Sequence, residues 1–401
     1  MVVSSTQENS PVLENMDFSE DVGIVQFFLN GDLRKNVDPI HSLTDNLTLS
    51  FDILSDEYSF LEARIIACDQ FWKRSNVSTL DYLQAPNNIS ITDFSYSVNT
   101  RIAYVNYQIK LPGFKLSGNY LVEIWNTDNN KKLLSRRIVV YEPLVTINAK
   151  ILYSQNISRR QSHHQIVFDL AYDQVEVFNP YADLYVAILQ NHNWEYHLAG
   201  LRPTLTRADE KLLEYRLYSG ENEFPAGNEF RLADLRATQF RGINVKAVRR
   251  GSVGFDLTLD TDKPKNQQPY SGLNQDENGG FLIANLDPDQ LEGQADYVRA
   301  QFSLASTPYP YEVYVVGKFN NWKSNERSRL SYNADLQQYE TDLILKQGLY
   351  DYQYVTEKPD EPYPEGNFAE TENEYEIIVY QQGPSQQKDR IIGYQKVSSR
   401  N

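Results

Sequence analysis

The chain has 401 residues, a formal net charge of −16, and 41% hydrophobic and 12% aromatic residues. At roughly 100–200 residues per domain this length predicts two to four domains with sizeable cores. The acidic balance excludes a nucleic-acid-binding surface, which needs clustered Lys and Arg. No run of about 18 apolar residues occurs, which excludes a membrane-spanning helix.

Apolar and polar residues alternate along many segments, which is typical of β-strands that bury one face and expose the other. In the segment 47–53, for example, four apolar residues alternate with Thr48, Ser50 and Asp52. The polar run Asp128–Asn130 separates two such segments and predicts a hairpin turn. The strands expected in chain order are 47–53, 103–111, 119–125, 131–140, 255–259, 339–345, 350–355 and 375–380.

Helical periodicity supports only two short turns, at 78–83 and 287–293. The 28 tyrosines suit half-buried strands, because an aromatic body with a polar tip fits a pleated surface. We therefore predict an all-β protein of tandem immunoglobulin-like β-sandwich domains. The expected organisation is a flexible N-terminus at 1–18, sandwiches at 19–143, 144–295 and 296–381, and a polar, loosely ordered tail at 382–401.

Signatures of enzymes are missing: the chain contains no nucleophile elbow, no P-loop, no dinucleotide-binding glycine motif and no zinc-protease motif. We accordingly assign no catalytic, cofactor-binding or metal-binding residue and expect no cofactor. The single cysteine, Cys68, excludes an intramolecular disulfide, and because it follows apolar strand residues we expect an inert buried thiol.

The five histidines and the acidic turns give weak metal patterns. His163 and His164 are adjacent, so on a strand they point to opposite faces. His192 and His197 flank Trp194, and an ordinary strand–loop is favoured there over a metal site. The segment Asp276–Gly279 matches half of a calcium loop but has no flanking helices, so a turn is the favoured interpretation.

The C-terminal part carries a more informative pattern. The segment Gly317–Trp322 reads Gly-Lys-Phe-Asn-Asn-Trp and is followed by the tyrosine-rich strand 350–355. This arrangement resembles the early-set immunoglobulin-like domains, which include glycogen- and starch-binding modules. Trp322 is interpreted as a buried corner of the sandwich core in preference to a sugar-stacking platform.

Several segments together resemble the plug protein of the type IX secretion system of Bacteroidetes. They span most of the chain and occur at 62–75, 80–83, 96–100, 104–112, 117–120, 222–231, 317–322, 347–350, 367–375 and 389–393. The residues of these motifs that we single out, with a structural role expected, are Cys68, Trp72, Gly227, Asn228, Glu229, Phe230, Arg231, Phe319 and Trp322.

The resemblance implies a non-enzymatic periplasmic protein at the inner face of the outer membrane, with its signal peptide absent from this chain. It would bind the periplasmic opening of the giant SprA-type translocon barrel, as a monomer within the complex, and occlude the pore until a substrate-shuttle complex engages. The alternative function is a carbohydrate-binding multi-domain β-sandwich protein that uses Phe319, Trp322, Tyr350 and Tyr352.

Overall fold

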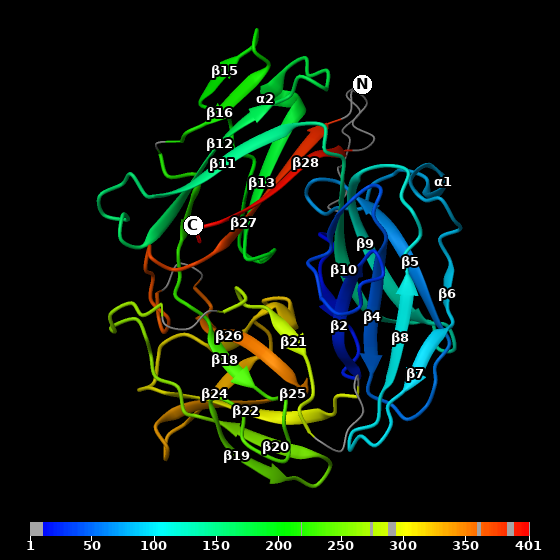
Figure 1. The fold of residues 1–401 in the computed structure, drawn as a ribbon, viewed down its shortest axis with the longest axis vertical. Coiled ribbons are helices and arrows are strands. Elements are labelled where there is room, and N and C mark those ends of the chain that lie inside the picture. Colours follow the sequence, from blue (N-terminus) through cyan, green and yellow to red (C-terminus); the bar gives the residue numbers. More distant parts are fainter. Residues whose placement is uncertain are drawn as a thin grey trace, which may run out of the picture.

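The computed structural model describes residues 11–217, 219–272, 276–287, 294–358, 362–382 and 389–400. Within them the chain is built almost wholly of strands, with two single-turn α-helices and one 3₁₀ turn, which confirms the predicted all-β class. None of these helices has the length and apolar character needed to cross a membrane. The strands form three units, which Figure 1 shows in blue to cyan, in green with red, and in yellow-green to orange apart from the green strand β18.

The first unit is a sandwich of two sheets. One sheet has the order β1-β10-β9-β5-β6, with β3 paired to β10, and the other has the order β2-β4-β8-β7. The bounds are β1 (Met16–Asp17), β2 (Val22–Leu29), β3 (Ile40–Ser42), β4 (Leu47–Ile53), β5 (Leu61–Cys68), α1 (Thr79–Tyr82), β6 (Ile89–Ile91), β7 (Asp93–Tyr96), β8 (Val105–Lys110), β9 (Gly118–Asn126) and β10 (Lys131–Tyr141). Apolar side chains from both sheets meet between them and form one large core.

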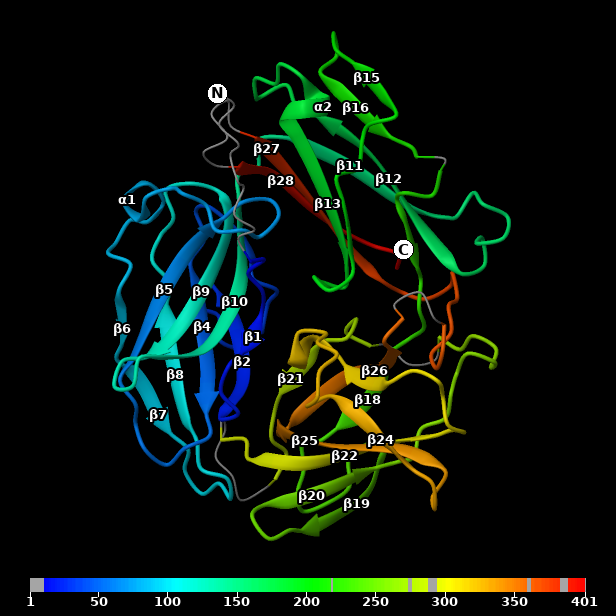
Figure 2. The same cartoon turned by 180° about the vertical axis from the view of Figure 1, so that it is seen from behind.

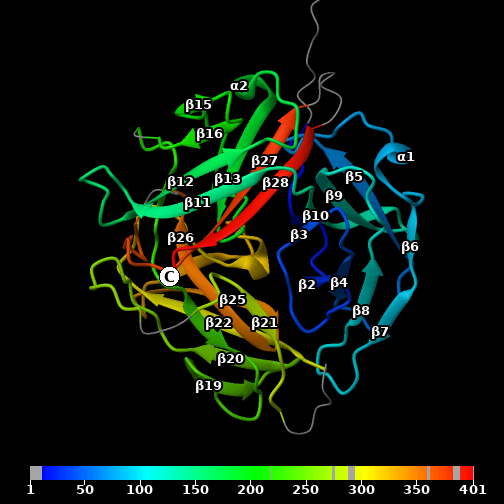
Figure 3. The ribbon, with the colours of Figure 1, turned by 45° about the horizontal axis from the view of Figure 1, so that its top comes forward.

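The second unit also has two facing sheets. Their orders are β11-β12-β16-β15, with β17 paired to β12, and β14-β13-β27-β28. The bounds are β11 (Thr146–Tyr153), β12 (His163–Ala171), α2 (Pro180–Asp183), β13 (Leu184–Gln190), β14 (His197–Ala199), β15 (Leu205–Arg207), β16 (Leu212–Tyr215), β17 (Glu223–Pro225), β27 (Glu374–Gln382) and β28 (Asp389–Ser398). Figure 3 shows the two C-terminal strands, in red, beside the green strands of this unit.

The third unit is one nine-stranded sheet of order β18-β26-β23-β24-β25-β22-β20-β19, with β21 paired to β26. Its core is a cluster of buried apolar residues that includes Ala233 of β18 and Leu257 of β20. The bounds are β18 (Arg231–Asp234), β19 (Val245–Arg250), β20 (Phe255–Leu259), β21 (Phe281–Ile283), β22 (Tyr297–Ala305), β23 (Val313–Val316), the 3₁₀ turn η1 (Lys318–Asn320), β24 (Arg329–Asn333), β25 (Gln338–Lys346) and β26 (Gly348–Thr356).

All eight expected strands are present, as β4, β8, β9, β10, β20, β25, β26 and β27. The hairpin turn between β9 and β10 and the helical turn α1 are confirmed as well. The helical turn expected at 287–293 lies outside the described residues except for Asp287, and so do residues 1–10 of the expected flexible N-terminus.

Strand pairing departs from the expected boundaries at both ends of the chain. Met16 and Asp17 pair with β10, so this part of the expected flexible N-terminus is an edge strand. β27 pairs with β13, which places it in the second unit and not in the segment expected at 296–381, and inserts the third unit between β17 and β27. The expectation of a loose tail is wrong for 389–398, because β28 pairs with β27 and buries Ile391 and Ile392.

The first and second units meet through sheet faces that point away from their own cores. Ile66, Leu121 and Val139 of the first unit form a shared apolar cluster with residues of β13, β27 and β28. Burial of this kind is the main favourable contribution to the association of two sheets. The two units therefore pack against each other and are not joined by a flexible linker alone.

Candidate functional site

The motif Gly227–Arg231 forms the connection from β17 to β18, where the chain leaves the second unit for the third. Gly227 has a φ of +68°, in the left-handed region that glycine tolerates best. Its N–H donates to Asn367 Oδ1 (3.0 Å), and its carbonyl accepts from Phe368 N (2.8 Å) and Thr371 Oγ1 (2.9 Å). The outgoing connection is thus bound to the returning segment that leads from β26 back to β27.

Arg231 is the charged centre of this crossing. Its guanidinium donates to Glu365 Oε1 (2.9 Å) and to Asp262 Oδ1 (2.8 Å), and it lies over the ring of Tyr354. Asp262 also accepts from the hydroxyls of Tyr352 (2.7 Å) and Tyr354 (2.9 Å). Burial disfavours the charge, but Glu365 and Asp262 outweigh it and raise the pKa of Arg231 above its ordinary value.

The other motif residues bind the same segments. Asn228 Nδ2 donates to the carbonyl of Glu365 (2.9 Å), and Glu229 Oε1 accepts from the backbone N–H of Glu372 (3.1 Å). The N–H of Phe230 donates to Asp276 Oδ2 (2.6 Å), and the Phe230 ring packs on Trp322 with centroids 5.7 Å apart. The structure therefore places the motif Gly227–Arg231 beside Trp322.

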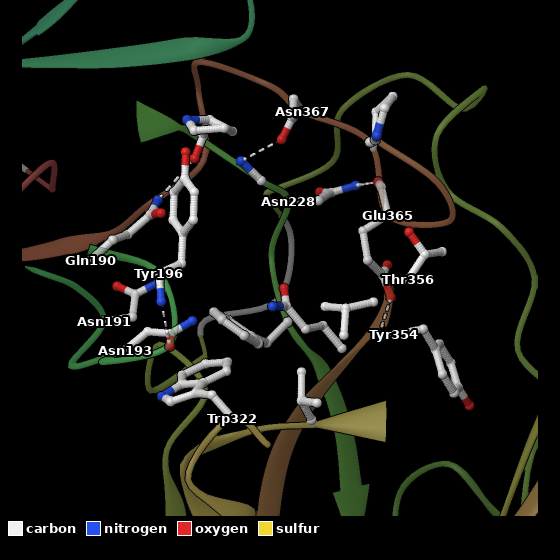
Figure 4. Close-up of a pocket in the computed structure, with 18 of the residues that line it drawn as sticks. Gln190, Asn191, Asn193, Tyr196, Asn228, Trp322, Tyr354, Thr356, Glu365 and Asn367 are labelled. Atoms are coloured by element: carbon white, nitrogen blue, oxygen red, sulfur yellow. Dashed lines mark hydrogen bonds between the residues drawn. The ribbon is translucent and has the colours of Figure 1, made fainter. Parts of the chain in front are cut away.

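A cavity of about 210 Å³ opens beside this crossing, between the second and third units. In Figure 4, Gln190, Asn191 and Asn193 lie on one side, Glu365 and Thr356 on the other, and Trp322 at the lower end. Several amide groups of the wall are already bonded to protein, as in Asn191 Nδ2 to Asn373 Oδ1 (2.7 Å).

The lining of this cavity contains several amides and two carboxylates that are already paired. Its amides neither titrate near neutral pH nor act as nucleophiles. The carboxylate of Glu365 is occupied by Arg231, and Glu195 forms an ion pair with Lys323 (2.8 Å). Within the described residues of the wall, no nucleophile lies beside a general base, which is the arrangement that group transfer requires.

Trp322 and Phe319 lie at the corner between β23 and β24. Trp322 is buried with Phe230 and Val316, and Phe319 meets Tyr350 edge-on with centroids 5.6 Å apart. Tyr350 and Tyr352 are 0% and 2% exposed. The four aromatic residues named for sugar stacking therefore do not form an exposed platform, because most of them belong to the interior of the third unit.

Cys68 and Trp72 lie at the contact between the first and second units. The Trp72 ring meets Trp194 edge-on, with centroids 4.9 Å apart, and the Arg137 guanidinium lies 4.5 Å from its centroid. Burial raises the pKa of the Cys68 thiol to about 12, and the nearby Asp69 acts in the same direction. The thiol is buried and far from its reactive thiolate form at neutral pH, as the sequence predicted.

All three units meet at Asp38, which precedes β3. Its carboxylate accepts from Lys318 Nζ of the third unit (3.0 Å) and from Lys396 Nζ of the second unit (3.2 Å). His192 and Glu376 lie beside it, with His192 Nδ1 2.9 Å from Glu376 Oε2. Burial alone would raise the pKa of Asp38, but Lys318 and the other cations around it hold the pKa far below its usual range.

Asp38, His192 and Glu376 have ligand atoms within 4.8 Å of one another, which is close enough to hold a metal ion. Two lysine ammonium groups already contact Asp38, so the cluster is a salt-bridge network between units. His197 takes no part in it, since its Nδ1 contacts the carbonyl of Trp194 (3.1 Å). The sequence hypothesis of a metal pair made by His192 and His197 thus gains no geometric support.

The other residues considered as metal ligands from the sequence make contacts that support the fold. His164 is buried and bonds to Tyr375 and to the carbonyl of Ala369, while His163 lies half-buried on the opposite face of β12. The segment Asp276–Gly279 forms the expected turn, with Asn278 and Gly279 at positive φ.

Sequence reasoning missed the buried contact between Asp52 and the third unit. Alternation in 47–53 predicted a solvated face, yet Ser50 and Asp52 are buried. Asp52 accepts from Lys346 Nζ (2.7 Å) and from the Tyr297 hydroxyl (2.7 Å), both of the third unit. No local signal marks such a contact, because its partners are about 250–300 residues away along the chain.

Comparison with known proteins gives a matching family model and similar solved structures. Residues 24–142 match the model described as the type 9 secretion system plug protein 1st domain. The crystal structure of a hypothetical protein from Parabacteroides merdae ATCC 43184 is similar with a TM-score of 0.91 and 29% identity, over 97% of this chain and 100% of that chain.

A second solved structure is not similar enough to this chain to indicate a shared fold. The three N-terminal domains of the bacteriophage RB49 Highly Immunogenic Outer Capsid protein (Hoc) align with 10% identity over 93% of this chain and 96% of that chain, but the TM-score is only 0.16. No curated protein matches the chain. The first unit of this chain is similar to the first domain of the plug protein of the type 9 secretion system.

Proposed function

We propose that this protein is a non-enzymatic periplasmic plug. It binds the periplasmic opening of the giant SprA-type outer-membrane translocon barrel as a single copy. It occludes the pore until a substrate-shuttle complex engages. The family match of residues 24–142 supports the secretion role, and the occlusion mechanism rests on the way in which the three units are joined.

The observation that carries this proposal is the set of ion pairs between units, of which the pair of Asp52 and Lys346 is buried. Asp52 of the first unit forms an ion pair with Lys346 of the third. Asp38 of the first unit forms ion pairs with Lys318 of the third unit and Lys396 of the second. A buried charge is stable only while it meets its partner, so these pairs favour a single orientation of the units. The units are therefore held in fixed orientation, and a body of 401 residues is roughly 50 Å across. A seal by steric occlusion needs such a rigid, wide body.

The net charge of −16 is consistent with docking on a protein rim. Anionic lipid surfaces attract basic segments, so an acidic body is disfavoured there. Occlusion also needs no reaction.

The test is a deletion strain complemented with the full chain. We expect the deletion to admit a small dye or antibiotic that the outer membrane normally excludes, and we expect the wild-type gene to restore exclusion. The barrel should co-purify with the tagged protein from detergent-solubilised outer membranes. Unchanged permeability together with absence of the barrel from the purified material would overturn the proposal.

The carbohydrate-binding alternative has less support, because its aromatic residues are largely buried. Affinity electrophoresis in starch or glycogen gels tests it directly. We expect no retardation of the wild-type protein. Retardation that disappears in a folded Trp322→Ala variant would favour sugar binding instead.

A further inference from the structure

Strand β7 lies at the free edge of the sheet β2-β4-β8-β7, on the outer rim of the first unit (Figures 1 and 2). Ser97 N donates to the carbonyl of Tyr104 (2.9 Å), which continues the β7–β8 ladder. Hydrogen-bonded and non-hydrogen-bonded pairs alternate in an antiparallel ladder, so the N–H and C=O groups of Phe94 and Tyr96 point away from β8. No described strand pairs with that side.

Two of the four side chains of β7, Phe94 and Tyr96, are aromatic and face the core side of the sheet. Phe94 pairs with Tyr107, and Tyr96 pairs with Val105. Directly opposite residues share a face, and both partners are 0% exposed core residues, yet Phe94 and Tyr96 are 39% and 51% exposed. The opposite sheet does not cover this end of the core.

Two further aromatic residues extend this surface. The Tyr58 centroid lies 4.5 Å from that of Phe94 and 5.1 Å from that of Phe60, which is 61% exposed. We call Tyr58, Phe60, Phe94 and Tyr96 the β7 edge patch. Exposed aromatic clusters of this kind mark interaction sites, and Tyr is enriched at the residues that contribute most to binding.

Strand β19, at the edge of the sheet of the third unit, is protected against pairing with other chains. Strand β19 carries the exposed cations Lys246, Arg249 and Arg250, and its register shifts between Val245 and Ala247. Charges and bulges on an edge strand prevent pairing with other chains. β7 has no register shift, and its one exposed charge, Asp93, lies at its first position, so the backbone at Phe94 and Tyr96 remains open for pairing.

The charges around the patch indicate what partner it fits. The exposed carboxylates Asp56, Glu57 and Asp93 flank the aromatic residues, and none of them forms an ion pair within the described part of the chain. The adjoining loop supplies one cation, Arg101. The local balance is acidic and favours a partner segment that carries Lys or Arg.

We propose that β7 is the docking edge for an extended segment of the translocon barrel's periplasmic rim, with apolar side chains at alternate positions and flanking basic residues. The segment adds a strand to β7, its backbone pairs with Phe94 and Tyr96, and its apolar side chains cover the β7 edge patch. Strand addition gives affinity through the main chain and specificity through alternate side chains. This inference rests on the proposed function, because it takes the barrel as the partner.

The test uses the full chain and the detergent-solubilised barrel. A photo-crosslinking benzoylphenylalanine replaces Phe94, and the same group at Phe178, which is 91% exposed in the second unit, is the matched control. We expect a crosslink to the barrel from position 94 and none from position 178. In addition, Phe94→Ser with Tyr96→Ser should weaken barrel binding at least tenfold, whereas Phe178→Ser should leave it unchanged.

The outcomes separate this inference from the proposed function. Wild-type binding without a crosslink at 94, or undiminished binding of the double variant, overturns the docking edge and leaves the plug intact. Failure of the wild-type protein to bind the barrel overturns the plug and the docking edge together. A crosslink from 94 to a second copy of this chain overturns the choice of partner. Should the double variant fail to fold, the crosslink decides, because it keeps an aromatic ring at position 94.

Discussion

The carboxylate of Asp52 and the ammonium of Lys346 lie 2.7 Å apart although 294 residues separate them in the chain. Both side chains are buried, and the Tyr297 hydroxyl donates to the same carboxylate oxygen. Burial disfavours the lysine charge, but Asp52 outweighs it and raises the pKa of Lys346. This contact is therefore a charged bond between the first and third units.

Replacing Lys346 by Met should lower the free energy of unfolding by about 3–5 kcal/mol, because Asp52 would remain buried without its cation. Urea denaturation followed by tryptophan fluorescence measures the change. Asp32→Asn is the matched control, since Asp32 pairs with Arg34 on the surface and its loss should leave the free energy of unfolding nearly unchanged. Equal effects of the two variants would contradict the structural role of the buried pair.

The same region shows how far the sequence could predict the fold. Alternation correctly predicts β4, because the period of two reflects the geometry of one strand. It is wrong about the environment of Asp52, because a second unit covers that face and no property of residues 47–53 encodes this. β28 was missed for a similar reason: its short apolar run, Ile391 and Ile392, becomes a strand only when β27 lies beside it.

The crossing between the second and third units was predictable in part. The motif Gly227–Arg231 was identified by resemblance, and the structure brings it to one connection. Its partners Asp262 and Glu365 carry no sequence signal, because ion pairs over 31 and 134 residues depend on topology alone. The network around Asp38 could not be predicted either, since its members come from all three units.

Gly227→Ala should destabilise the protein by about 1 kcal/mol through backbone conformation alone. An added Cβ meets no atom within 4 Å, so steric overlap contributes nothing, and the positive φ accounts for the cost. Gly227→Asn should cost less, because Asn tolerates the left-handed region better than Ala. Thermal and urea unfolding measure both variants, and equal costs would show that the positive φ is not the cause.

Asp351→Asn should stabilise the protein above neutral pH. Burial raises the pKa of Asp351 to about 7, and the neighbouring Asp276 and Glu277 act in the same direction. A carboxyl with a raised folded pKa stabilises the folded state below its unfolded pKa of 3.8, and this contribution is lost as pH rises through 7.

With each pKa unit equal to about 1.4 kcal/mol, the variant should gain about 1–3 kcal/mol at pH 8, and the gain should shrink towards pH 5. Urea unfolding of both proteins across this range measures the difference. The exposed Asp335→Asn in the same unit is the control and should change stability by less than about 0.5 kcal/mol. A gain that is independent of pH would exclude ionisation of Asp351 as its cause.

Cys68 should react with a thiol reagent only when the first and second units separate. The thiol is buried in the shared apolar cluster, and its pKa of about 12 leaves roughly one molecule in ten thousand as thiolate at pH 8. We expect labelling by a chromogenic disulfide at least about 1,000-fold slower than in urea-unfolded protein. Trp194→Ala, which removes the ring against Trp72, should speed labelling, whereas Trp322→Ala in the third unit should not. Fast labelling of the native wild-type protein would show that this interface opens freely.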